Sequence, residues 1–205
     1  MTTAVKERPI LFSGPMVRAI LAGQKTQTRR VVDLSKGWDV GPNYAGECWP
    51  VRKVKNELVR MRCPYGQVGE RLWVRETHYV ERAGYQDGSD RFILYKATDD
   101  HAPVSKWTPS IHMPRFASRI NQEIVRVSVE RLQDITNLDC NAEGITPIGK
   151  GIAMPDGSFA QAGRYESKAS TVRQLFSGVW ESINGPGSWD LNPWVWVVQF
   201  KKLSP

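Results

Sequence analysis

The alternation of apolar and polar residues along the chain predicts many short strands. The clearest alternation covers residues 123–132, where Val125, Val127 and Val129 fall on one face and polar residues on the other. A period of two is typical of a strand with one buried face. The same reasoning predicts further strands at residues 8–12, 25–32, 58–62, 71–75, 92–95 and 194–200.

Three segments have the spacing of amphipathic helices instead. The longest, residues 171–183, has apolar residues every three or four positions, and we assign this stripe to the core. A shorter helix is expected to begin after Thr136, a favourable N-cap residue, and to end at Gly144. The third covers residues 16–22 and ends at Gly23.

Strands outnumber helices and occur throughout the chain, which predicts an α+β fold. We expect a small curled sheet or barrel flanked by two or three helices, and we disfavour a doubly wound α/β fold. With 205 residues, the chain is long enough for one core, so residues 1–205 are read as a single domain. Residues 37–57 and 146–161 are rich in Gly and Pro, and we expect both to be loop insertions outside the core.

The charge of the chain is unevenly distributed. The net charge is +7; residues 1–75 hold 14 Lys and Arg against 6 Asp and Glu, whereas residues 76–205 hold 14 against 15. Clustered cations of this kind fit a polyanion such as RNA, because binding releases counterions from phosphates. A basic face that only aids solubility would have the same composition.

Several classes of protein do not fit the sequence. No uncharged apolar run reaches the roughly 18 residues of a membrane span, and the N-terminus has no apolar leader. Cys48, Cys63 and Cys140 are odd in number and form no CxxC pair, which argues against a disulfide framework and against structural zinc. We therefore expect a cytoplasmic protein that has no contact with a membrane.

Two further motifs are incomplete. The segment from Gly144 to Gly151 matches G-x-x-x-x-G-K, but it has Gly where a phosphate-binding loop needs Ser or Thr, and Pro147 removes a backbone N–H. The three histidines lack the His-x-Glu and Cys-x-x-Cys pairing of zinc deaminases. We expect neither a metal nor an organic cofactor.

The densest polar motif follows the first predicted helix. Residues 23–30 bring together one amine, two hydroxyls and two guanidiniums directly after the glycine that ends the helix. Such a group suits an anionic or amide-bearing ligand, although a solvated strand could have the same residues. Lys25 and Thr28 can converge only if Lys25 still lies in the turn, because alternate residues of a strand point to opposite faces.

This motif resembles a known family signature. Gly23-x-Lys25-Thr26-x-Thr28-x-Arg30 is similar to the G-x-K-T-x-T-x-R pattern of the ASCH domain, a small β-barrel related to the PUA RNA-binding domains. Residues 69–76 resemble its G-D-x-L-x-V-R strand, and residues 198–200 resemble its closing strand. The whole chain looks like the long ASCH-type proteins that phages and prophages carry.

The resemblance implies candidate site residues. One bacterial branch of the family removes the acetyl group from N(4)-acetylcytidine, and its Lys, Thr and Glu match Lys25, Thr28 and Glu143 here. In such an enzyme the hydroxyl would attack, the amine would act as base and the carboxylate would orient it or move a proton. Candidate substrate-binding residues, which would hold a phosphate or stack on a base, are Thr26, Arg29, Arg30, Trp73, Arg75 and Glu76.

Three functions therefore remain open. The first is a metal-independent amide hydrolase that acts on an acylated pyrimidine nucleoside or nucleotide. The second is a noncatalytic module that binds RNA or a modified base. The third is a ribonuclease, in which Lys25 and an arginine would stabilise charge at phosphorus.

Overall fold

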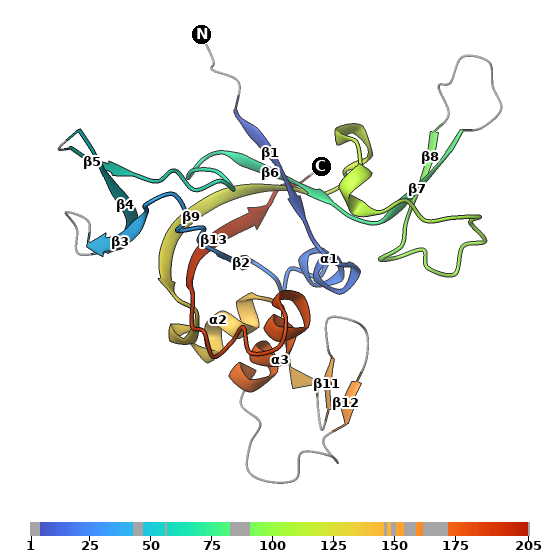
Figure 1. The fold of residues 1–205 in the computed structure, drawn as a ribbon. Coiled ribbons are helices and arrows are strands. Elements are labelled where there is room, and N and C mark those ends of the chain that lie inside the picture. Colours follow the sequence, from blue (N-terminus) through green and yellow to red (C-terminus); the bar gives the residue numbers. More distant parts are fainter. Residues whose placement is uncertain are drawn as a thin grey trace.

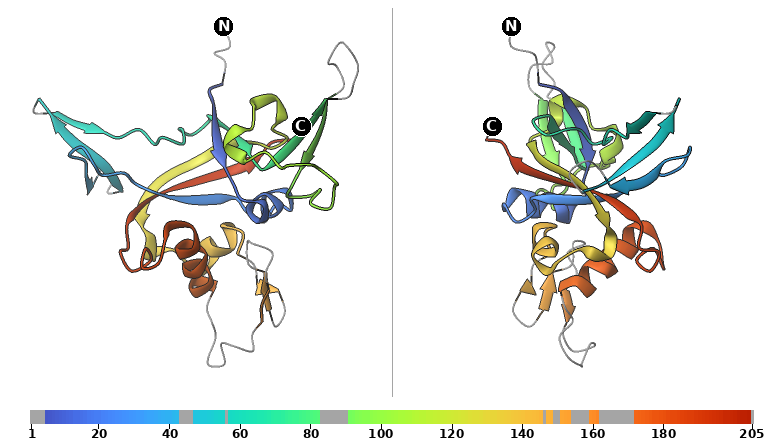
Figure 2. Two further views of the ribbon diagram at one scale, coloured as in Figure 1. Left: turned by 45° about the vertical axis from the view of Figure 1, so that its right-hand side comes forward. Right: turned by 90° about the vertical axis from the view of Figure 1, so that its left-hand side faces the viewer.

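The computed structural model describes residues 5–42, 47–55, 57–82, 91–145, 147–148, 151–153, 159–161 and 172–204. Within these ranges the chain is an α+β structure made mostly of sheets, with three α-helices. Helix α2 (Asn137–Ala142) and helix α3 (Val172–Asn184) lie together beside a central curved sheet, and helix α1 (Gly14–Leu21) lies near α3 (Figures 1 and 2). The predicted fold class is thus confirmed at this level.

The central sheet has five strands in the order β1-β6-β9-β13-β2. Strand β1 (Glu7–Leu11) pairs in parallel with β6 (Arg71–Arg75), and the other neighbours are antiparallel. Strand β9 (Asn121–Arg131) and strand β13 (Trp194–Lys202) form the centre, and β2 (Gln27–Val31) closes the series. In the described residues β1 and β2 do not pair, so the sheet is open there.

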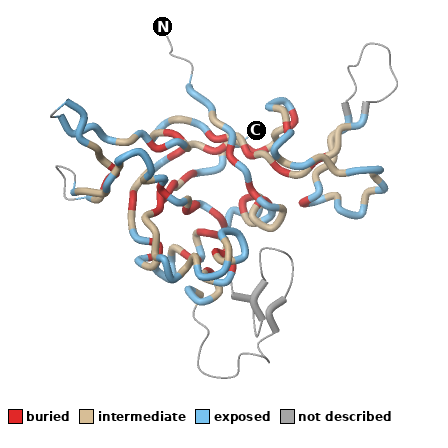
Figure 3. Tube along the Cα trace, in the orientation of Figure 1, coloured by how far each residue is buried: buried red, intermediate tan, exposed pale blue. Residues whose placement is uncertain are grey.

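Strand β13 shows why the sheet has apolar material on both faces. Trp196, Val198 and Phe200 pack into one cluster with residues of β1, β6 and α1. Val195 and Val197 point the other way and join a second cluster with residues of α2 and α3. A strand buried on both faces reads as a nearly continuous apolar run, as residues 194–200 do apart from Gln199. Figure 3 shows the buried residues concentrated along this sheet and under the two helices.

Helix α2 begins as its sequence predicts. The hydroxyl oxygen of Thr136 accepts a hydrogen bond from the backbone N–H of Asp139, and the Asp139 carboxylate accepts one from the backbone N–H of Thr136. This reciprocal pair satisfies two donors at the helix start. The chain then leaves α2 at Gly144, which has a positive φ of 90°.

One prediction for β9 is wrong in phase. Val125 is 42% exposed, although the alternation placed it on the core face with Val127 and Val129. Phe200 pairs with Ile124 whereas its neighbour Gln199 pairs with Arg126, so Val125 is the extra residue of a bulge. A bulge shifts the alternation by one residue. Even-numbered positions therefore face the core before the bulge and odd-numbered positions face it afterwards.

The prediction of a loop at residues 37–57 is also wrong. This segment contains β3 (Asp39–Pro42) and all of β4 (Cys48–Val54), which form a three-stranded antiparallel sheet with β5 (Glu57–Arg60). Trp49 in β4 is buried and meets Trp196 edge to face, with 5.1 Å between ring centroids. The Gly and Pro residues of this segment favoured the prediction of a loop. The buried side chain of Trp49 nevertheless packs this sheet against the core.

The second predicted loop, residues 146–161, contains three short strands where the structure describes it. These are β10 (Pro147–Ile148), β11 (Gly151–Ala153) and β12 (Phe159–Gln161), and they form an antiparallel sheet of their own. The rest of this predicted loop lies outside the described residues.

The remaining elements flank the central sheet. Strands β7 (His78–Arg82) and β8 (Arg91–Tyr95) form a two-stranded arm, and three single turns of 3-10 helix are at Ser110–His112, Arg115–Ala117 and Leu132–Asp134. Strand β7 is absent from the sequence prediction. None of the helices in the described ranges is long and apolar enough to cross a membrane.

Candidate functional site

The site is built where the turn after α1 meets the end of α2. Gly23, at a φ of 73°, ends α1, and the backbone N–H of Lys25 donates to Ala19 O. On the facing side, a Cβ on Gly144 would lie 2.9 Å from Ala19 Cβ and 3.3 Å from Lys25 Cβ. Only glycine allows this close approach at a positive φ. The approach brings Glu143 against Lys25.

The ammonium group of Lys25 is fully buried and fully bonded. Its Nζ donates to the backbone oxygen of Gln27 at 2.8 Å, to the backbone oxygen of Glu143 at 2.9 Å and to Glu143 Oε2 at 2.7 Å. The exposed fractions of the Lys25 and Glu143 side chains are 0% and 5%. Lys25 and Glu143, 118 positions apart in the sequence, are therefore in direct contact in the structure.

Arg29 completes a buried network of charges. Its Nη1 donates to Glu143 Oε1 at 3.1 Å, while its Nε and Nη2 donate to Glu130 Oε1 at 2.9 and 2.7 Å. Asp139 Oδ2 lies 3.6 Å from Arg29 Nη2. Two cations thus face three carboxylates, and Glu143 is the carboxylate that both cations share.

Burial lowers the pKa of Lys25 below its usual range, and the Glu143 carboxylate opposes that shift. A lowered pKa is what a lysine base requires. As arranged, however, all of its N–H donors have acceptors, so the geometry is that of an ammonium that holds Glu143 and the turn in place. Proton transfer to Lys25 would first require this ammonium to lose a proton.

Thr28 lies apart from this network. Along β2 the side chains of Gln27 and Arg29 reach α2, so strand alternation places Thr28 on the opposite face, with Arg30. Thr28 is 1% exposed and pairs with Val198 of β13. In the described part of the chain, no hydrogen bond links its hydroxyl to Lys25.

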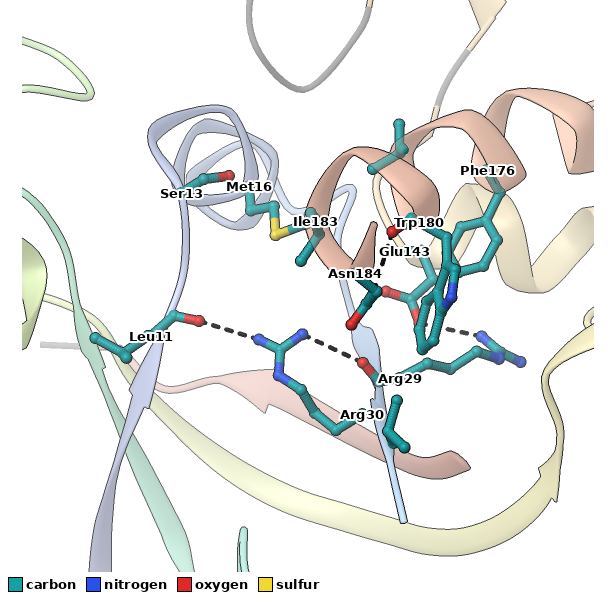
Figure 4. A pocket seen from close by; sticks show the side chains of 12 residues that line it. Leu11, Ser13, Met16, Arg29, Arg30, Glu143, Phe176, Trp180, Ile183 and Asn184 are labelled. Atoms are coloured by element: carbon teal, nitrogen blue, oxygen red, sulfur yellow. Dashed lines mark hydrogen bonds and ion pairs between the residues drawn. The ribbon is translucent and has the colours of Figure 1, made fainter. Parts of the chain in front are cut away.

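A cavity of about 350 Å³ opens beside the network, between β2, the start of α1 and α3. Figure 4 shows Arg29 and Arg30 below Trp180, Ile183 and Asn184 of α3, with Glu143 drawn between Asn184 and Trp180. The wall is mainly apolar, with a few polar groups among apolar side chains. Its lining residues are Leu11, Ser13, Met16, Arg29, Arg30, Val31, Glu143, Phe176, Val179, Trp180, Ile183 and Asn184.

Glu143 is therefore the one residue of the proposed trio that lines this cavity. Lys25 does not line the cavity but donates a hydrogen bond to the Glu143 carboxylate, whereas Arg29 and Arg30 line the cavity directly. Arg30 donates to the backbone oxygens of Leu11 and Arg29 and lies 5.5 Å from the Phe12 ring centre. Thr26 is exposed directly before β2 and does not line the cavity.

The other predicted binding residues lie on β6 and directly after it. Glu76 is 1% exposed and its carboxylate accepts from Arg119 Nε and Nη2 at 2.9 and 3.0 Å, which is a structural ion pair. Trp73 faces outward between the guanidiniums of Arg75 and Arg115, at 5.5 and 5.8 Å from the ring centre. Neither Trp73 nor Glu76 lines the cavity.

Sequence reasoning missed the contribution of α3. Trp180, Ile183 and Asn184 were assigned to a core stripe or left out, but they line the cavity. Ile183 is 58% exposed at the C-terminal end of that stripe. The indole N–H of Trp180 is buried and has no hydrogen-bond partner among the described residues. An apolar stripe does not reveal which of its positions meet a neighbour and which meet an opening.

Comparisons of the chain with protein-family models, with curated proteins and with solved structures gave no match. The functional argument therefore rests on the geometry of the cavity and on the residues that surround Lys25.

Proposed function

We propose that the chain is an ASCH-like, PUA-related module that binds the base of a nucleoside or of RNA in the cavity between β2 and α3. The observation that carries the proposal is the cavity itself, because about 350 Å³ lies in the range of small-molecule sites, ~300–1,000 Å³. Its apolar wall can cover the faces of a flat ring. Its few polar groups can recognise the edge.

The polar groups offer both donors and acceptors. Arg30 uses two N–H groups on backbone oxygens and keeps others for a ligand. Glu143 is an anchored acceptor, and Asn184 donates to Trp180 O while its own side-chain oxygen has no partner among the described residues. A pyrimidine edge with adjacent donor and acceptor groups suits this set.

Binding is favoured over covalent catalysis by the state of the predicted nucleophile and base. Each N–H of Lys25 is already used, and the Thr28 hydroxyl is on the other face of β2 from Arg29. The Lys25–Glu143 pair instead fixes a carboxylate at the cavity wall, which a recognition site needs. Preorganised polar groups reduce the free energy that binding spends on ordering side chains.

Isothermal titration with cytidine and with N(4)-acetylcytidine tests the proposal. Asn184→Ala removes a cavity amide and should weaken binding by about fivefold, the equivalent of ~1 kcal/mol for one neutral hydrogen bond. Asn137→Ala, at the exposed start of α2, is the matched control and should bind as the unaltered protein does. If neither cytidine nor N(4)-acetylcytidine binds, the proposal is refuted.

A second candidate function, deacylation of an N(4)-acetylcytidine-like nucleoside, is favoured by one observation. The family resemblance pairs Lys25 with Glu143, and the two are 2.7 Å apart and buried. In this reaction Thr28 Oγ1 would bond to the acetyl carbon and pass its proton to a neutral Lys25. The C–N bond would then break as the amine takes that proton, and water would release acetate from Thr28.

The candidate enzyme and the binding module differ in their response to Thr28→Ala and Lys25→Arg. An enzyme would lose kcat by orders of magnitude in both variants and keep most of its affinity, because both groups act in the transition state. A binding module would release no acetate at all. Release of acetate at an unchanged rate by Thr28→Ala would exclude the threonine ester.

A further inference from the structure

A second cavity adjoins the first one at Arg30. It has a volume of about 250 Å³ and lies between β1, β2 and the end of β6. Leu11 and Arg30 line both cavities, and Arg30 Nη2 donates to Leu11 O at 3.0 Å on the boundary. The second cavity is lined by Pro9, Ile10, Leu11, Arg30, Tyr65 and Arg75.

Two arginines, Arg30 and Arg75, line this space without a carboxylate partner among the described residues. None of the ion pairs within the described ranges includes Arg30 or Arg75. Lys25 and Arg29, only a few residues away in the chain, are in contrast neutralised by Glu143 and its neighbours. The positive charge of the site is therefore concentrated on the side of the second cavity.

Arg75 also has a donor that makes no hydrogen bond. Its Nη2 donates to the backbone oxygen of Ile111, but its Nε is buried and has no partner among the described residues. An unpaired buried donor is unfavourable, and a small rotation toward an anion would give it one. Tyr65 also lines this cavity, and burial raises the pKa of its hydroxyl, so that this group stays protonated.

We propose that the second cavity is a phosphate subsite in which Arg30 and Arg75 bind the anion from two sides. This inference rests on the proposed function and makes it more specific: the ligand is a nucleotide, with its base in the first cavity and its phosphate in the second. Guanidiniums suit this task because their planar N–H groups match phosphate oxygens in pairs. Arg30 belongs to both cavities and joins the two parts of the ligand.

Inorganic phosphate tests the subsite separately from the base cavity. In ¹⁵N-labelled protein, the Nε–H signals of Arg30 and Arg75 should shift on titration with phosphate. Arg75→Gln should weaken phosphate binding by about tenfold or more, as expected for a lost charge-assisted hydrogen bond. Arg71→Gln removes the same charge from an exposed position of the same strand and should leave phosphate binding unchanged.

The same variants are then titrated with cytidine, 5′-CMP and the dinucleotide CpC. The unaltered protein should bind 5′-CMP about tenfold or more tightly than cytidine, and Arg75→Gln should remove that advantage. Comparison of 5′-CMP with CpC separates a phosphomonoester from an RNA phosphodiester. Asn184→Ala should weaken cytidine binding but not phosphate binding.

The outcomes separate the two proposals. Phosphate binding that depends on Arg75, without cytidine binding, supports the subsite and refutes the base cavity. Equal affinity for cytidine and 5′-CMP, or equal loss of phosphate binding in Arg75→Gln and Arg71→Gln, overturns the subsite.

Discussion

Replacement of Glu143 by Gln is the perturbation that the buried network predicts most sharply. Gln keeps the shape of the side chain but removes the negative charge shared by Lys25 and Arg29. Arg29 retains Glu130 at 2.7 Å, whereas Lys25 loses the one carboxylate within ion-pair distance in the described residues. The substitution should therefore destabilise the fold mainly because Lys25 is left buried without a carboxylate partner.

The structure sets the magnitude of this cost. Removal of one partner of a buried ion pair destabilises by ~3–5 kcal/mol. Lys25 keeps two backbone acceptors and the Gln oxygen can accept a third bond, so we expect the lower end, about 3 kcal/mol. In a chain of this size that corresponds to a fall in Tm of roughly 6–12 °C.

The loss of folding stability in Glu143→Gln should be smaller in alkaline solution. Burial lowers the pKa of Lys25 in the folded state, and without Glu143 the pKa falls further, whereas the unfolded chain keeps the ordinary value. Between the two values the unfolded state binds more protons, so stability rises with pH by up to ~1.4 kcal/mol per unit. The deficit of Glu143→Gln should therefore be smaller at pH 9 than at pH 7.

Urea unfolding followed by far-UV circular dichroism at both pH values measures this effect. Glu123→Gln is the control, because Glu123 pairs with Lys201 at the surface, where side chains are 33% and 60% exposed. An exposed pair contributes only ~0.2–1 kcal/mol. A Glu143→Gln protein as stable as Glu123→Gln at pH 7 would refute the reasoning.

Three further predictions concern the fold. Burial lowers the pKa of His78, so stability should fall as pH decreases from ~6.5 toward that lowered value, and this fall should be smaller in His78→Gln but not in His101→Gln. Trp49→Ala should lower the free energy of unfolding in urea by ~3–5 kcal/mol, because Trp49 is buried against Trp196. A smaller loss of stability than in Phe92→Ala, at an exposed position, would contradict the packing of β4 against the core. Thr136→Ala should cost ~1 kcal/mol through loss of the helix cap, and an unchanged urea midpoint would contradict the capping box.

Local sequence signals predicted the elements that are stabilised locally. The Thr136 cap and the glycine stop define α2, and the apolar run at residues 194–200 defines β13, because these features act within a few residues. The bulge at Val125 could not be predicted, because it depends on the pairing of β9 with β13. Trp49 was missed for the same reason: its burial depends on Trp196, which is distant in the sequence.

In the site, too, features that depend on local sequence could be predicted, and features that depend on distant parts of the chain could not. The motif around Lys25 and the resemblance that points to Glu143 single out two residues that are in contact in the structure, but only Glu143 lines the cavity. The opening itself depends on how α3 lies against β2, so Trp180 and Asn184 could not be identified as lining residues from an apolar stripe. The phase of β2 was readable from alternation, and it separates Thr28 from Arg29 in the structure.

The indole N–H signals of the eight tryptophans provide the most direct test of the proposal that the first cavity binds a nucleobase. Trp180 lines the cavity and its indole N–H has no partner among the described residues, whereas Trp73 lies on the outer face of β6 between two arginines. On titration of ¹⁵N-labelled protein with cytidine, the Trp180 signal should shift and saturate while the Trp73 signal stays in place. A saturating shift of Trp73 with no change at Trp180 would contradict the proposed site.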